Sequence, residues 1–118
     1  MAPPTPLAIA TSSLQRLVKE EVSYEKELQG QETRLEKLLA TKDQDENAEY
    51  QLKQELTSIQ RAAIQETKNV FPPLRERIKD ALQKLEDQVE DGESNGADEG
   101  EITKAKEVIE SAKQASRT

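Results

Sequence analysis

Apolar residues recur at intervals of three and four along the N-terminal part of the chain. Between residues 6 and 41 they fill most of two positions of a heptad, one beginning at Leu7 and the other at Ala10. This spacing places them on one face of an α-helix. Thr5 and Pro6 are typical of a helix start, because a Thr side chain caps the first turn and proline suits the first helical position. We therefore predict a helix over residues 6–41.

The spacing returns after a polar, turn-forming segment and predicts a second, longer helix over residues 44–90. Pro72 and Pro73 interrupt it, because proline cannot donate a hydrogen bond to the carbonyl four residues back. The helix therefore either kinks or breaks there. We favour a kink, since the apolar stripe resumes in near register at Leu74 and Ile78.

The segment over residues 91–100 is rich in glycine and acids, and we expect it to be a flexible acidic linker. A short third helix is predicted over residues 101–116, where the apolar spacing is three and four again. Three amphipathic helices in one small domain, residues 1–118, predict an all-α, up-down-up three-helix bundle with coiled-coil-like packing. The third helix is too short to cover all of the other two. Residues 28–39 and 50–64 should therefore form a nearly bare two-helix hairpin.

Two polar residues, Glu21 and Gln31, occupy the apolar seam of the first helix. They are compatible with a loose, wet part of the bundle, or with a seam that stays partly open until a partner arrives. A polar seam residue can also set the register between helices. The sequence leaves these three interpretations open.

Charged residues make up 35% of the chain and apolar residues 33%, and this mixture is typical of long helices and coiled coils. The net charge is −7 and is unevenly placed, since residues 86–101 hold eight acids and no base. The other residues carry 16 acids against 17 bases, so no basic face is indicated and nucleic-acid binding is not expected.

The chain has no Cys and no His, so it lacks thiol chemistry and both the commonest general base and the commonest metal ligand. Its glycines form no phosphate-binding loop. We expect no enzyme, no cofactor, no metal and no small-molecule substrate. The longest apolar run, residues 7–10, is too short to span a membrane, and residues 1–6 do not resemble a secretion signal. We therefore expect a cytoplasmic protein without a membrane partner.

Several segments resemble tubulin-binding cofactor A, a family of small tubulin-folding cofactors. Residues 17–27 (LVKEEVSYEKE) are similar to the first helix of that family. Residues 50–55 (YQLKQE), and Phe71-Pro72 followed by residues 75–85, resemble its long, proline-kinked second helix. Residues 105–112 resemble its last helix. The likeness covers nearly the whole chain, although no single motif in it is specific.

The resemblance implies a cytoplasmic, cytoskeleton-associated chaperone. It would capture and hold β-tubulin on the post-chaperonin folding pathway, without nucleotide. The alternative is a generic helical adaptor or coiled-coil module in trafficking or cytoskeletal assembly, which would dock a helix of its partner in a groove. A prefoldin-like subunit is less compatible, because residues 42–47 are too few to hold the strands of that fold.

The expected partner site lies on the hairpin, where no third helix would cover the apolar stripe. We predict that the partner contacts Leu28, Glu32, Leu35, Tyr50, Lys53 and Leu56. Alternatively the hairpin closes on itself or dimerises, and the partner binds the outer charged faces around Lys19, Glu20, Arg75 and Arg77.

Overall fold

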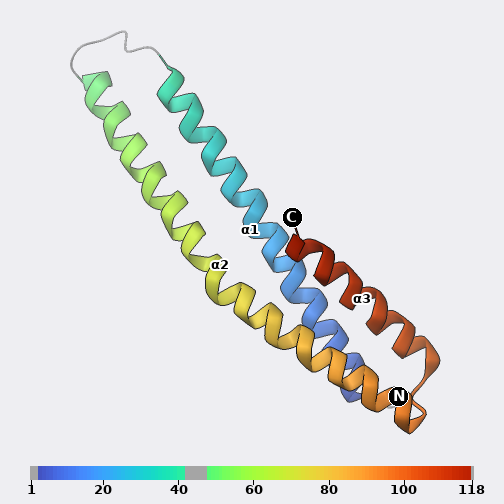
Figure 1. Cartoon of the computed structure of the whole chain (residues 1–118). Coiled ribbons are helices and arrows are strands. Elements are labelled where there is room, and N and C mark those ends of the chain that lie inside the picture. The colour runs from blue at the N-terminus through green and yellow to red at the C-terminus, as the bar shows by residue number, and fades with distance from the viewer. Residues whose placement is uncertain (1–2, 42–47, 118) are drawn as a thin grey trace. The chain divides into compact units, whose positions relative to one another are not determined.

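The computed structural model describes residues 3–41 and 48–117, and three helices account for most of them. Helix α1 spans Pro6–Ala40, α2 spans Ala48–Asn95 and α3 spans Glu99–Arg117 (Figure 1). The predicted all-α fold is confirmed. Residues 42–47, which include the predicted start of the second helix, lie outside the described residues.

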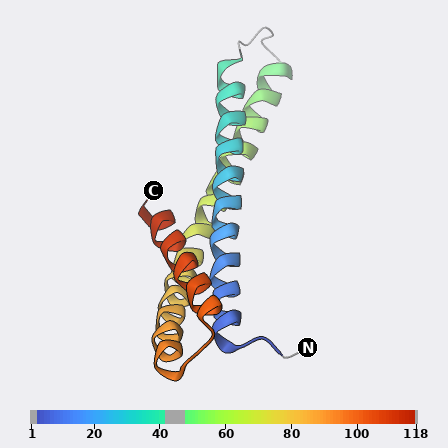
Figure 2. The same cartoon turned by 90° about the vertical axis from the view of Figure 1, so that its right-hand side faces the viewer.

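The helices form two compact units. One, the three-helix unit, consists of residues 1–21 and 73–118, and the other, the hairpin unit, consists of residues 22–72. In the three-helix unit α3 lies beside the start of α1 and the end of α2 (Figures 1 and 2). In the hairpin unit the end of α1 runs antiparallel to the start of α2. The expectation that the shorter third helix leaves a two-helix hairpin is confirmed.

All three helices contribute to the apolar core of the three-helix unit. Leu14 of α1 and Leu74 and Leu85 of α2 are fully buried. Burial of one such leucine stabilises a fold by about 1.5–3 kcal/mol. Helix α3 contributes mainly small residues, with Ala105 and Ala112 buried, and small contact residues let helices approach closely.

The hairpin unit is held by a more polar interior. Its large buried apolar residues, among those described, are Ile64 and Phe71, and the Phe71 ring meets Tyr24 edge-on with the centroids 6.4 Å apart. Gln31, Thr57 and Thr67 are buried as well, and the seam leucines of α1 are only half-buried. This interior therefore gains less from apolar burial than the core of the three-helix unit.

Helix α1 begins where its sequence predicts. The backbone N–H of Ala8 donates to Thr5 Oγ1 over 3.1 Å, which is the hydrogen bond of an N-terminal cap. The same hydroxyl donates to Glu101 Oε1 of α3 over 2.6 Å. The cap thus also joins two helices of the three-helix unit.

Helix α2 is continuous through Pro72 and Pro73, so the alternative of two separate helices is wrong. The prolines are exposed, and water can reach the carbonyls of residues 68 and 69 that they leave without amide donors. The buried residues Phe71 and Leu74 flank them, which keeps the apolar face unbroken.

The predicted flexible linker over residues 91–100 is wrong. Helix α2 continues to Asn95 and α3 begins at Glu99, instead of the predicted ends at residues 90 and 101. Gly96 adopts a positive φ of 73°, and the N–H of Ala97 donates to the carbonyl of Gly92 over 2.8 Å. These are the features of a Schellman cap. Asp98 then caps α3 by accepting from the N–H of Glu101 over 3.1 Å, so the connection is a compact turn.

Replacement of Gly96 tests this turn. Gly96→Ala should lower the free energy of unfolding by about 1 kcal/mol, because a Cβ disfavours a positive φ. Space is not the cause, since a Cβ there would meet nothing within 4 Å. The control is Ser94→Ala, an exposed helical position two residues earlier, which should be neutral or slightly stabilising. Equal stability of Gly96→Ala and wild type in urea unfolding would contradict the proposed cap.

Candidate functional site

Exposed large apolar side chains gather in the hairpin unit. Seven occur among the described residues, and only Ile9 belongs to the three-helix unit. The other six are Val22, Leu39, Tyr50, Leu52, Leu56 and Ile59. Ile59 is the most exposed, at 62%. Exposed apolar residues that cluster rather than scatter mark interaction sites, so the hairpin unit is the candidate binding region.

Two grooves between α1 and α2 contain most of these residues. The first, which we call the Ile59 groove, has a volume of about 360 Å³. Its lining residues are Arg34, Lys37, Leu38, Thr41, Leu56, Ile59 and Gln60. Three large aliphatic side chains form its floor and walls. Gln60, one of the lining residues, donates from Nε2 to the backbone carbonyl of Gln31 over 3.2 Å.

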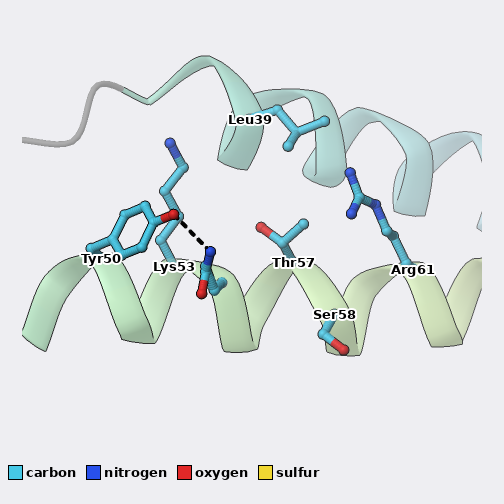
Figure 3. Close-up of a pocket in the computed structure, with 7 residues that line it drawn as sticks. Leu39, Tyr50, Lys53, Thr57, Ser58 and Arg61 are labelled. Carbon is cyan, nitrogen blue, oxygen red and sulfur yellow. Dashed lines mark hydrogen bonds between the residues drawn. The ribbon is translucent and has the colours of Figure 1, made fainter.

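The second, the Tyr50 groove, has a volume of about 410 Å³ (Figure 3). It is lined by Leu39, Tyr50, Lys53, Gln54, Thr57, Ser58 and Arg61. Figure 3 shows Tyr50, Lys53 and Arg61 rising from α2 towards α1, which contributes Leu39. The Tyr50 hydroxyl accepts from Gln54 Nε2 over 2.8 Å, so the ring is held in place at the rim.

Every charged side chain that lines these two grooves, within the described part of the chain, is a cation. Arg34 and Lys37 line the Ile59 groove, and Lys53 and Arg61 line the Tyr50 groove. Lys53 is engaged, since its ammonium donates to the carbonyl of Thr41 just after the end of α1. A cation at a helix C-terminus binds free carbonyls and offsets the helix dipole. Both grooves therefore carry positive charge, and the Ile59 groove has the more apolar lining while that of the Tyr50 groove is mixed.

The alternative site, on the outer charged faces, consists largely of ion pairs between helices. Arg75 Nε of α2 donates to Glu21 Oε2 of α1 over 3.3 Å, and Arg77 lies 3.9 Å from Glu20. The Glu21 side chain is only 9% exposed, so this pair is partly buried. These ion pairs join α1 to α2 in the three-helix unit. Glu21 of the apolar seam therefore contacts the opposite helix and does not mark a loose, hydrated part of the bundle.

Lys19 lies apart from those pairs. It lines a groove of about 310 Å³ between α1 and α3, with Val18, Lys104 and Glu107. Val108 is buried there and Val18 is half-buried, so neither is an exposed large apolar side chain. This groove thus combines apolar and charged side chains.

Comparison with known proteins identifies the family. The sequence profile of the family described as "Tubulin binding cofactor A" matches residues 2–109. The chain belongs to the tubulin binding cofactor A family. The family resemblance inferred from the sequence is therefore confirmed.

Curated relatives agree over nearly the full length. A protein of Saccharomyces cerevisiae named "Tubulin-specific chaperone A" is 34% identical over 111 residues, which cover 92% of this chain and 97% of the relative. A Mus musculus protein of the same name is 31% identical over 107 residues, covering 91% and 90%. No solved structure matches the chain significantly. The names of the family and of these relatives refer to tubulin and to a chaperone, and not to a catalysed reaction. No described helix is long and apolar enough to cross a membrane.

In this tubulin binding cofactor A family member, the structure brings together only some of the residues that were predicted to contact the partner. Tyr50, Lys53 and Leu56 line the two grooves, whereas Leu28 and Leu35 are half-buried between the helices and Glu32 is exposed outside both grooves. Most of the groove residues were not predicted, among them Arg34, Lys37, Leu39, Ile59 and Arg61. Leu39 and Ile59 belong to the apolar stripes of the sequence, which was the available signal. Whether any of these residues contacts a partner stays a prediction.

Replacement of Gln31 tests the polar interior of the hairpin unit. Its side-chain oxygen Oε1 is buried without a hydrogen-bond partner. Gln31→Leu should raise the free energy of unfolding by about 1–2 kcal/mol, because it removes an unsatisfied polar group and keeps the volume. The control Gln29→Leu, at an exposed position of the same helix, should stay within about 0.5 kcal/mol of wild type. Destabilisation by Gln31→Leu would show that the amide is satisfied after all.

The two arginine pairs predict unequal effects on stability. Arg75→Glu should lower the free energy of unfolding by about 2 kcal/mol, since it leaves the buried Glu21 carboxylate facing a like charge. Arg77→Glu should change it by at most about 0.5 kcal/mol, because both members of that pair are exposed. Thermal unfolding of the two variants measures the difference. Similar losses would mean that burial of Glu21 does not matter.

Proposed function

We propose that this protein is a tubulin-folding chaperone that captures and holds β-tubulin on the post-chaperonin folding pathway, without nucleotide. Family membership and the name "Tubulin-specific chaperone A" of its relatives support tubulin as the partner. The protein would act in the cytoplasm, in association with the cytoskeleton. The finer points, namely β-tubulin and the stage after the chaperonin, follow from the resemblance described above.

The proposed mechanism is binding alone. A protein that binds one form of a client stabilises that form by mass action, and this requires neither a covalent step nor nucleotide hydrolysis. Among the described residues, no cluster of His, Cys, Asp or Glu is arranged to hold a metal ion. What the chain does offer is an exposed apolar surface on a helical scaffold, which is the property that a holding chaperone uses.

The observation that carries the proposal is the concentration of exposed apolar residues in the hairpin unit. Leu56 and Ile59 are 42% and 62% exposed, although both belong to the apolar stripe that the sequence pattern predicts for this helix. They remain exposed because this unit has two helices, whereas a third helix covers the corresponding stripe in the other unit. An unfilled stripe of this kind is where a client can add the missing layer.

Paired substitutions at an exposed leucine and an exposed isoleucine test this function. The Leu56→Ser and Ile59→Ser double variant should weaken β-tubulin capture about 30-fold, because loss of two apolar anchors costs about 2 kcal/mol of binding free energy. Radiolabelled β-tubulin released from the chaperonin, followed by native gel electrophoresis, measures the complex. Labelled α-tubulin serves as the test of β-specificity.

The matched control is Ile9→Ser, an isoleucine of the three-helix unit that is 53% exposed. It should leave capture unchanged. If the wild-type protein captures no β-tubulin, the proposed function is wrong. If Ile9→Ser weakens capture and the double variant does not, the client binds the three-helix unit instead.

A further inference from the structure

We infer that the Ile59 groove receives an amphipathic helix of the client that carries carboxylates along its edge. The inference rests on the proposed function, because it describes the part of the client that enters the site. It depends on three features of the hairpin unit: the form of the groove, the charge on its rim and the nature of its lining.

The form of the groove suits a helix. Two antiparallel helices, α1 and α2, present Leu38 on one side and Leu56 and Ile59 on the other. The α1 residues that line the groove extend from Arg34 to Thr41, which corresponds to about 12 Å along a helix axis. This length accommodates roughly two turns of a docked helix. Within the three-helix unit the same two helices already pack against a third, α3, so the chain itself shows that their surfaces accept one.

The charge on the rim selects an acidic partner. Arg34 and Lys37 line this groove, and no acidic side chain of the described residues lines it with them. This local positive charge contrasts with the net charge of −7 of the whole chain. Carboxylates on the client helix would pair with these cations at the rim while its apolar face covers Ile59. Complementary charge of this kind speeds association and fixes register.

Charge also argues against a second copy of this chain as the occupant. Two copies that each carry −7 repel one another on approach. The acidic residues 86–93 could nevertheless supply carboxylates, so self-association is one outcome that the experiment must detect. The occupant favoured by the observations is therefore a client helix with a local excess of acid.

Charge reversal on the rim tests the inference. The Arg34→Glu and Lys37→Glu double variant should weaken β-tubulin capture at least tenfold at low salt, and the difference from wild type should shrink as salt rises. Arg34→Gln with Lys37→Gln should give an intermediate loss. The matched control is Lys26→Glu, an exposed lysine of α1 that lines neither groove, and it should bind as wild type. Circular dichroism establishes that each variant is folded.

A photo-crosslinking residue at position 59 identifies the occupant directly. We expect mass spectrometry to map the crosslinks to a β-tubulin helix with carboxylates three or four residues apart. Crosslinks to a strand, to a basic segment or to a second copy of this chain would overturn the inference. Unchanged capture by the Arg34→Glu and Lys37→Glu double variant would also overturn the inference. Capture by wild type in the same assay would still leave the proposed function intact. Absence of capture by wild type would overturn both.

Discussion

Three helices meet around Leu14, Leu74 and Leu85, and the rest of the structure depends on this shared burial. Only 33% of the chain is apolar, so the residues that can form a core are limited. Most of the buried ones belong to the three-helix unit, where α3 supplies the third layer. The 19 residues of α3 cannot serve both units, since α1 and α2 have 35 and 48 residues.

The short length of α3 explains the contrast between the two units. Where the third layer is present, leucines are fully buried and the seam glutamate is neutralised by Arg75. Where it is absent, threonine and glutamine occupy interior positions and leucines and an isoleucine remain exposed. A weaker interior permits local opening at a lower free energy than a leucine core would. The hairpin unit therefore has the accessible apolar surface that the proposed client binding requires.

The helices could be predicted from the sequence because their apolar spacing is regular over many turns, and Thr5 marked the start of α1 correctly. The connection between α2 and α3 was misjudged because composition dominated the interpretation of residues 91–100. Gly96 and Asp98 are single residues with specific roles, a left-handed cap and an N-terminal cap, and they resemble linker residues when only their types are counted. The residues that line the two grooves could be predicted only in part, because a heptad pattern identifies the seam but not which flank of it remains uncovered.

The positively charged residues show most clearly what the sequence pattern leaves undetermined. Arg75 and Arg61 both belong to α2 and both are exposed, so their positions in the sequence do not distinguish them. The structure does, because Arg75 pairs with Glu21, 54 residues away, while Arg61 lines a groove beside Leu39. A cation whose partner is a buried carboxylate serves the fold, and its reversal disturbs stability and binding together. A cation on the rim of an apolar groove is placed to meet a partner. Arg34, Lys37 and Arg61 line the two grooves of the hairpin unit, whereas Arg75 and Arg77 of the outer faces are engaged in ion pairs. The proposed recognition of a partner therefore relies on the groove cations.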